Sequence, residues 1–174
     1  MTLTLRPPST MAAMLLLTLA FFATTALSET LKAPEGEVIL TVTGNVHVTN
    51  AMDKAEFDLE MLEALPATEF TTSTIWTAGE QTYTGVELKT FLDSLEATGT
   101  MIDATAINDY SVEIPISDAV EGGPILAYKS DGAYMSRRDK GPIWLIYPYD
   151  QNADYRSETI YSRSIWQLDR LNVK

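Results

Sequence analysis

The sequence predicts an α+β domain in which mixed sheets of short strands pack against one or two helices. Three observations favour this class. Short runs rich in β-branched residues recur along the chain, turn residues separate them, and only two segments carry helical periodicity. The 174 residues suffice for one domain with its own core, because domains typically hold about 100–200 residues. Strands and helices that do not alternate regularly favour a segregated α+β architecture.

Composition excludes several classes of function. The 24 acidic residues outnumber the 12 basic ones, so nucleic acid and anionic membrane surfaces are unfavourable partners. The chain has no cysteine, which excludes a disulfide, a thiolate nucleophile and a metal-bound thiolate. The chemistry must therefore come from other polar and aromatic side chains.

Residues 1–28 are expected to form an export signal peptide. Arg6 supplies a positive n-region, Met11–Phe22 is the apolar h-region, and the small residues of Ala26–Ser28 suit a signal peptidase. The apolar run is shorter than the roughly 20 residues that a spanning helix needs, which favours cleavage before Glu29 over an uncleaved anchor. After cleavage we expect no direct membrane insertion.

The domain is expected at residues 38–174, after a polar leader at 29–37. Val38–Gly44 is rich in β-branched residues, and a turn at its end predicts a first β-hairpin with Val46–Val48. His47 is the only histidine, and no second histidine or cysteine is present to join it in a metal site. A metal or catalytic role for His47 is therefore disfavoured.

Two segments carry the helical pattern. Phe57–Leu65 predicts a short amphipathic helix with Asp58 as its N-cap. Val86–Leu95 is clearer, because apolar residues recur on one face with i, i+3, i+4 and i+7 spacing. Thr84 and Glu87 have the spacing of a capping box for this second helix.

Further strands are predicted around these helices. Glu69–Trp76 is rich in threonine, whose hydroxyls either face solvent on an ordinary sheet surface or line a polar cavity. Met101–Ile107, Tyr110–Ile116 and Ile125–Lys129 follow, with a turn at Asn108-Asp109 between the first two.

The last segment, Ser164–Lys174, is predicted to be a strand anchored in a sheet. Its alternation of apolar residues changes phase at Asp169-Arg170, as a β-bulge requires. The polar region before it, which includes Tyr155-Arg156 and Tyr161–Arg163, could lie over a pocket.

Met135–Asp150 places several cations in a strongly acidic chain. Arg137, Arg138 and Lys140 lie in a predicted loop, and Ile143–Tyr147 follows as a buried-strand pattern. These cations either bind an anionic or polar ligand at the mouth of the strand or form an exposed loop that balances nearby carboxylates.

Common catalytic arrangements find little support. Serine catalysis needs a neighbouring base, and the sole histidine lies in a predicted strand far from any Gly-x-Ser-x-Gly elbow. The acidic residues are scattered, without the spacing of a calcium loop, and no glycine-rich phosphate loop is present. Glycoside hydrolysis needs only two carboxylates and is not excluded in so acidic a chain, although no sequence pattern places two carboxylates together.

Aromatic, amide and charged residues at predicted strand ends indicate a pocket for a flat heterocycle. Aromatic faces stack on such a ring, and a carboxylate accepts hydrogen bonds from its N–H edge. The alternative is that each aromatic side chain is an ordinary core residue. The candidates are Trp76, Asn108, Asp109, Tyr110, Arg137, Arg138, Lys140, Tyr147 and Tyr149, with Asp139 as a second acceptor.

Four groups of residues occur in the order found in one known family. They are Leu40–Gly44, Trp76 with Thr84–Leu88, Asn108–Ser111, and Lys140–Pro142 with Tyr147-Pro148. Together they resemble the oxidoreductase molybdopterin-binding domain of sulfite oxidases, over about Val38 to Val173. The match looks closest to small exported stand-alone versions of that domain, and it implies the sulfite oxidase molybdopterin-binding fold.

The resemblance has one departure. Catalytic members hold molybdenum through a cysteine thiolate before the Trp–Gly-Val block, and here that region, Phe70–Trp76, has none. A threonine hydroxyl does not replace a soft thiolate as a molybdenum ligand. The implied cofactor is therefore a reduced pterin or a molybdopterin-like compound without molybdenum, and redox catalysis by the usual mechanism is not expected.

The resemblance implies a periplasmic pterin-binding protein that regulates a membrane enzyme making or degrading cyclic di-GMP, with the periplasmic domain of that enzyme as partner. In this hypothesis Trp76, Tyr110 and Tyr149 stack on the ring. Asn108 and Asp109 bind the pterin edge, and the three cations hold a polar tail. The alternatives are a molybdopterin-dependent oxidoreductase or its accessory subunit, and an interaction module without a ligand.

Overall fold

The computed structural model describes residues 1–2 and 31–174. The predicted signal peptide, apart from Met1 and Thr2, and the first two residues of the leader lie outside the described residues. In the part that is described, no helix is both long and apolar enough to cross a membrane.

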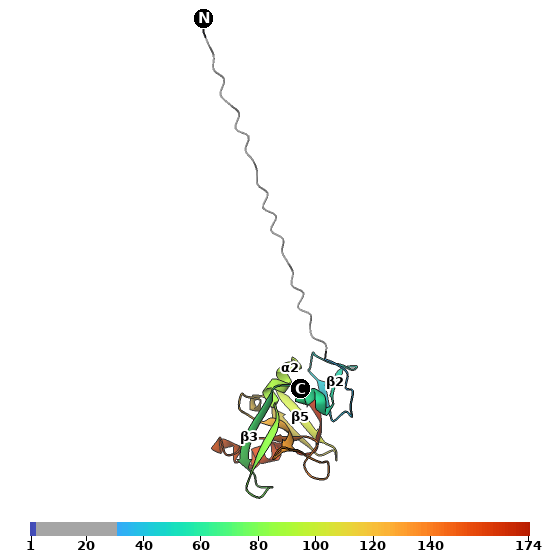
Figure 1. Cartoon of the computed structure of the whole chain (residues 1–174), viewed down its shortest axis with the longest axis vertical. Coiled ribbons are helices and arrows are strands. Elements are labelled where there is room, and N and C mark those ends of the chain that lie inside the picture. The colour runs from blue at the N-terminus through green and yellow to red at the C-terminus, as the bar shows by residue number, and fades with distance from the viewer. Residues whose placement is uncertain (3–30) are drawn as a thin grey trace.

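One five-stranded sheet contains both ends of the domain. Its strand order is β2-β1-β10-β5-β6, and the C-terminal strand β10 pairs parallel with β1 and antiparallel with β5. Figure 1 shows the C-terminus beside β5 and α2. The prediction that the chain end is anchored in a sheet is therefore confirmed. The bounds are β1 (Leu40–Gly44), β2 (Lys54–Phe57), β5 (Met101–Ala106), β6 (Ser111–Pro115) and β10 (Leu168–Val173).

The second sheet is built around β7. This strand pairs antiparallel with β4 and also with β8 and β9, and β3 extends the sheet beyond β4. The strands are β3 (Ala67–Ser73), β4 (Glu80–Glu87), β7 (Ile125–Ser130), β8 (Ala133–Tyr134) and β9 (Trp144–Ile146). An isolated bridge between Trp144 and Trp166 joins β9 to the segment that leads into β10.

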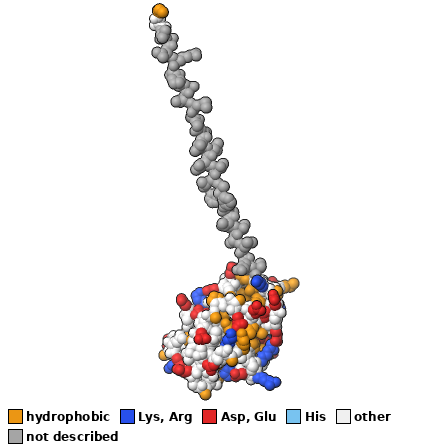
Figure 2. All heavy atoms as spheres, viewed as in Figure 1, with side chains coloured by type: hydrophobic (Ala, Val, Ile, Leu, Met, Phe, Trp, Pro, Cys, Tyr) orange, Lys and Arg blue, Asp and Glu red, His pale blue; other side chains and the backbone are white. Residues whose placement is uncertain are grey.

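Short helices accompany the two sheets. They are α1 (Leu59–Glu63), α2 (Leu88–Ser94) and α3 (Glu158–Arg163), with 3-10 turns η1 (Ile116–Asp118) and η2 (Ala153–Tyr155). The predicted apolar face of the second helix is confirmed, because Leu88, Phe91, Leu92 and Leu95 are all buried. The structure thus has the α+β class that the sequence predicts. On the face drawn in Figure 2, acidic and basic side chains are interspersed.

Two strand details confirm predictions from the alternation of side chains. The register between β10 and β5 shifts between Leu168 and Arg170, which is the predicted bulge. The strands β5 and β6 pair directly across the Asn108-Asp109 turn. These two features place the last strand and this turn next to each other.

The predicted first hairpin is wrong. Val46–Val48 forms no strand, and the backbone N–H groups of His47 and Val48 donate to the Leu95 carbonyl at 3.0 and 3.2 Å. The partner of β1 is β2 instead. Strand propensity alone does not choose a partner, and here tertiary contact with the end of α2 determines the path.

Several predicted boundaries are also wrong. Thr84 and Glu87 belong to β4, which runs directly into α2, so they form no capping box, and the Glu87 carboxylate accepts from the Gly122 N–H at 3.2 Å. The first helix begins only after Phe57, which ends β2, and β3 ends at Ser73. The helix α3 was not predicted, since it has less than two turns of pattern to detect.

Asp58 was predicted as an N-cap, and the structure confirms it. One carboxylate oxygen accepts from the Met61 N–H at 2.9 Å, and the other accepts from the Glu35 and Gly36 N–H groups at 2.9 and 2.8 Å. Asp58 is buried. The hydrogen bond from Gly36 is the main cause that holds the pKa of Asp58 below its ordinary value.

Asp58→Ala should lower the free energy of unfolding by about 1–3 kcal/mol, because it removes the helix cap and leaves the leader N–H groups unpaired. Since the folded-state pKa is lowered, the charged carboxylate stabilises the protein above the unfolded pKa of about 3.9, and that contribution is lost as pH falls through the folded value. Urea unfolding from neutral to acidic pH measures both effects. Asp58→Asn keeps an acceptor without the charge and should show a weaker fall in stability at acidic pH. If the stability of Asp58→Asn depended on pH in the same way as that of the unchanged protein, the Asp58 carboxylate would not be the group responsible.

Candidate functional site

Two cavities within residues 31–174 bear on the candidate site, and the larger has a volume of about 400 Å³ and an aromatic lining. It lies where the β5–β6 turn, α3 and the segment before β10 meet. Amide and hydroxyl groups complete its wall, and none of its lining residues in the described part of the chain is charged. Its lining residues are Trp76, Ala106, Asn108, Tyr110, Tyr161, Ser162, Ser164, Ile165, Trp166 and Gln167.

Trp76 is the central ring of the site. Its centroid lies 5.5 Å from that of Trp166, 5.7 Å from Tyr161 and 5.8 Å from Trp144, and the three pairs make edge contacts at 79°, 84° and 68°. Such edge-to-face pairs stabilise a fixed ring orientation by about 0.5–1.5 kcal/mol each. The Trp76 ring therefore has a fixed orientation in the wall of the cavity, and it is only partly buried.

Hydrogen bonds after β3 hold the Trp76 segment in place. The Thr74 hydroxyl accepts from the Trp76 N–H at 3.1 Å, and the Ser73 hydroxyl donates to the Asp150 carboxylate at 2.9 Å. The hydrogen bond from the Ser73 backbone is the first cause that lowers the pKa of Asp150. Buried Thr72 accepts from the Asp150 N–H at 3.1 Å. Part of the threonine-rich strand thus fixes the loop after β9.

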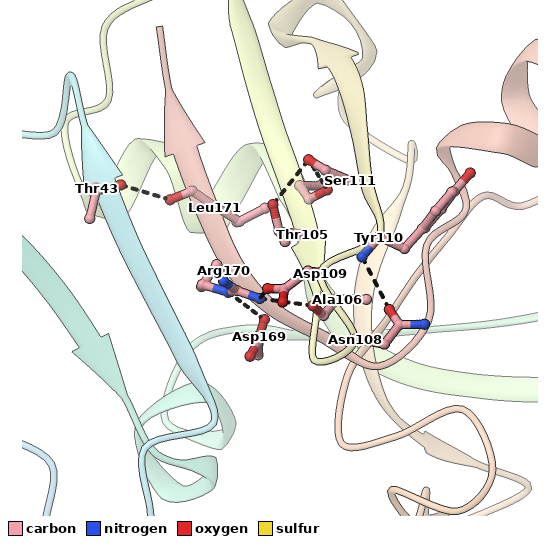
Figure 3. Close-up of polar contacts among 11 residues, drawn as sticks. Thr43, Thr105, Ala106, Asn108, Asp109, Tyr110, Ser111, Asp169, Arg170 and Leu171 are labelled. Carbon is pink, nitrogen blue, oxygen red and sulfur yellow. Dashed lines mark hydrogen bonds and ion pairs between the residues drawn. The ribbon is translucent and has the colours of Figure 1, made fainter.

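The β5–β6 turn presents Asn108 and Tyr110 to the larger cavity. Asp109 has a positive φ of 65°, and the Arg170 guanidinium donates to its carboxylate at 2.8 Å and to the Ala106 carbonyl at 2.9 Å. The Asn108 side chain accepts from the Tyr110 N–H at 3.2 Å. Figure 3 shows Asp109 beside Arg170, with Asn108 and Tyr110 on the other side of the turn. Arg170 of β10 therefore helps to fix the shape of the turn.

The helix α3 and the residues after it form another wall. The Arg163 guanidinium donates to Asp118 of η1 at 2.9 Å, and both side chains are mostly buried. The buried Ser164 hydroxyl accepts from Tyr149 and donates to the Ile160 carbonyl at 2.8 Å. The Tyr161 ring, which lines the cavity, packs against the rings of Trp76 and Tyr149.

A smaller cavity of about 240 Å³ also has Trp76 in its wall. Lys140 reaches it with its ammonium 5.3 Å from the Trp144 ring centroid and 4.9 Å from that of Trp166, at distances typical of cation–π contact. The lining residues are Trp76, Thr77, Ala78, Gln81, Ser130, Met135, Asp139, Lys140 and Trp144.

The basic loop turns most of its charge away from both cavities. Arg137 forms an ion pair with Glu37 at 2.7 Å, and Arg138 is exposed. The Gln167 side-chain amide donates to the carbonyls of Arg137 and Asp139 at 2.7 and 3.2 Å. A Cβ at Gly141 would lie 1.9 Å from the Met135 carbonyl oxygen, so the loop requires glycine there.

The structure brings some of the predicted site residues together. Trp76, Asn108 and Tyr110 line the larger cavity, and Lys140 with Asp139 lines the smaller one. The others line neither cavity: Asp109, Arg137, Arg138, Tyr147 and Tyr149.

Tyr147 and Tyr149 are core residues with satisfied hydroxyls. Tyr147 donates to Asp118 at 2.7 Å and Tyr149 donates to Ser164. Both rings are buried, and burial raises the pKa of each well above its ordinary value. Tyr149 touches the Trp76 ring at 6.4 Å between centroids and so supports the cavity wall from behind.

Sequence reasoning missed Trp166 and Gln167 as lining residues. Both precede the bulge, and Gln167 adopts a positive φ of 54°, which alternation within a strand does not predict. The polar region expected to cover a pocket comprised Tyr155-Arg156 and Tyr161–Arg163. Tyr161 and Ser162 line the larger cavity, whereas Tyr155 and Arg156 line neither cavity, so the expectation is confirmed in part.

The donor set does not fit a bound molybdenum ion. The chain has no cysteine, and across residues 31–174 no three histidine, aspartate or glutamate side chains gather into a metal-binding group. Hard hydroxyl and amide oxygens do not replace a soft thiolate. The larger cavity does fit the flat ring of a pterin, because it has aromatic walls and amide groups.

Comparison with known proteins gives one family. The sequence profile of the oxidoreductase molybdopterin binding domain matches residues 39–152, which is more than half of the chain. No curated protein sequence gives a significant match.

Gln167→Ala should loosen the loop at residues 136–141, since it removes two hydrogen bonds to loop carbonyls while leaving the same Cβ in the same backbone conformation. Hydrogen exchange should become faster at the Asp139 and Gly141 amides, which both donate to the Ser136 carbonyl. Global stability should fall by only about 1–2 kcal/mol. Gln151→Ala on the exposed surface is the control, and unchanged exchange at both loop amides would show that Gln167 does not hold the loop.

Proposed function

Because the chain belongs to the oxidoreductase molybdopterin-binding domain family, we propose that it binds a pterin in the larger cavity and does so without molybdenum. The observation that carries the proposal is the lining of that cavity, in which rings of Trp76, Tyr110 and Trp166 accompany the amides of Asn108 and Gln167. Ligand pockets are commonly apolar with few placed polar groups.

The chemistry of the lining matches a pterin in two ways. Its indole and phenol faces can stack on a flat heterocycle. For the ring edge, the Asn108 amide offers its donor hydrogens and the Gln167 amide offers its acceptor oxygen, because the Gln167 amide already donates to the carbonyls of Arg137 and Asp139. Asp109, which sequence analysis favoured as an acceptor, is paired with Arg170 instead. In the proposed complex Asn108 takes over the recognition of the edge, because it lines the cavity directly.

The absence of any thiol from the sequence supports binding over redox catalysis. In the catalytic members of the family a thiolate from this segment holds molybdenum. Here the segment Phe70–Trp76 has no thiol, and its last residue, Trp76, lines both cavities. A molybdopterin-dependent oxidoreductase, or its accessory subunit, is the competing function that family membership supports.

We further propose that the protein acts in the periplasm as a ligand-dependent regulator of a membrane enzyme of cyclic di-GMP metabolism. The signal-like N-terminus and the resemblance to exported stand-alone members support this. Tyr110 and Trp166 line the cavity and are also 54% and 36% exposed, so a bound ring would alter a surface that a partner can contact. Cross-linking to the periplasmic domain of such an enzyme, with and without pterin, tests the proposal, and ligand-independent contact would contradict it.

Titration with a reduced pterin should quench tryptophan fluorescence and saturate at one ligand per chain. Trp166→Ala and Tyr110→Ala should each weaken binding by about 1–3 kcal/mol, the range for loss of one stacked ring. Tyr134→Ala is the matched control, because Tyr134 is 55% exposed, contacts Glu63 and lines neither cavity. The proposed site would be contradicted if Trp166→Ala, Tyr110→Ala and Tyr134→Ala all weakened pterin binding equally, or if pterin binding did not saturate.

Protein purified from its native host should contain pterin and less than stoichiometric molybdenum. Mass spectrometry of the released ligand and elemental analysis of the same sample measure the two quantities. One molybdenum per chain would overturn the binding function in favour of the oxidoreductase.

A further inference from the structure

The two cavities share one indole wall. Trp76 lines both, its ring contacts Trp144 of the smaller cavity and Trp166 of the larger one, and these two rings lie 6.3 Å apart between centroids. Lys140 lies over both Trp144 and Trp166. The smaller, polar cavity therefore borders the larger one at the Trp76 ring.

The smaller cavity offers both donors and acceptors. The Lys140 side chain is only 19% exposed and its ammonium lies 4.0 Å from the Asp139 carboxylate. The Gln81 carbonyl oxygen already accepts from Tyr83 at 2.9 Å and from Ser130 at 3.4 Å, which leaves its amide hydrogens as donors. Hydroxyl groups suit such a mixed lining, because each hydroxyl donates one hydrogen bond and accepts others.

The charge around the smaller cavity does not favour an anion. Lys140 is accompanied by Asp139 in the same wall. The pKa of Tyr83 is raised to about 12, mainly by burial and in smaller part by the carboxylates of Asp131 and Asp139, so two carboxylates act on this neighbourhood. The larger cavity adds no cation, and the chain as a whole carries a net charge of −12. A phosphate monoester, with about −1.5 to −2 charges at neutral pH, would meet carboxylates beside its one cation.

We infer that the smaller cavity is the subsite for a short, uncharged, hydroxyl-bearing substituent on the ring that the larger cavity binds, so that the protein selects hydroxylated over phosphorylated ligands. This inference rests on the proposed pterin-binding function. Lys140 and Gln81 donate to the hydroxyl oxygens, and Asp139 accepts from a hydroxyl hydrogen. Lys140 is then a specificity-determining residue and not a general anion-binding group.

The test compares three pterins in one oxidation state by calorimetry: a methyl-substituted pterin, neopterin with its trihydroxypropyl chain, and neopterin monophosphate. Neopterin should bind about tenfold or more tightly than the methyl compound, and its monophosphate should bind about tenfold or more weakly than neopterin. Higher salt should reduce the difference in affinity between neopterin and its monophosphate, because it screens the repulsion between the phosphate and the carboxylates. Equal binding of all three, or tightest binding of the monophosphate, would overturn the subsite. Binding of none would overturn the pterin-binding function itself.

Two variants separate the subsite from the ring site. Lys140→Met keeps a long side chain against Trp166, so it should remove most of the gain from the trihydroxypropyl chain and leave methylpterin affinity within about twofold. Asp139→Asn should strengthen binding of the monophosphate severalfold. Lys89→Met is the matched control, because Lys89 is an exposed cation that pairs with Asp93 on α2. Equal weakening of methylpterin and neopterin by Lys140→Met would show that Lys140 acts only through Trp166.

Discussion

The pairing of β10 between β1 and β5 is the constraint on which the candidate site depends. Gln167 and Leu168, at the start of this strand, make backbone hydrogen bonds to three other segments. The Ile107 N–H donates to the Gln167 carbonyl at 2.9 Å, the Gln167 N–H to the Lys140 carbonyl at 2.9 Å, and the Leu168 N–H to the Ile143 carbonyl at 3.0 Å. One short segment therefore joins the β5–β6 turn, the basic loop and the strand β9. The larger cavity lies beside this junction, with Trp166 and Gln167 in its wall.

Rigid rings and satisfied hydroxyls preserve the shape of the cavity. Trp76 is oriented by edge contacts with its aromatic neighbours, and behind it the Tyr149 hydroxyl is anchored on Ser164. Buried polar groups that are fully paired rigidify their surroundings, whereas unpaired ones cost free energy. Because the rings are positioned by the fold, ligand binding would lose little conformational entropy in ordering them.

The sequence predicted the parts of this structure that depend on local pattern. The apolar face of α2, the β5–β6 pair, the buried strand β9 and the bulge in β10 each leave a periodic signal, and Trp76, Asn108 and Tyr110 stand at strand ends where a pocket is plausible. The rest depends on pairing between distant segments. No local sequence pattern indicates that β1 pairs with β10 rather than with Val46–Val48, which follows it in the sequence. Likewise, no local pattern indicates that Arg170 forms an ion pair with Asp109. Tyr147 and Tyr149 share the composition of a binding site, yet their fully buried rings belong to the core.

The proposed function separates recognition of a ring from ligation of a metal. The larger cavity is shaped by strand pairing, by the Arg170–Asp109 contact at the turn and by the Arg163–Asp118 contact that holds α3, and these interactions join protein groups to each other. A thiolate would contribute one bond to a metal, but the stacking faces and edge amides come from residues that the sheets already position. Under the proposed function, a chain without the ligating cysteine therefore keeps the groups that recognise a pterin. The indole of Trp76 lines both the aromatic cavity and the polar one, so the same residue borders the two parts of the proposed site.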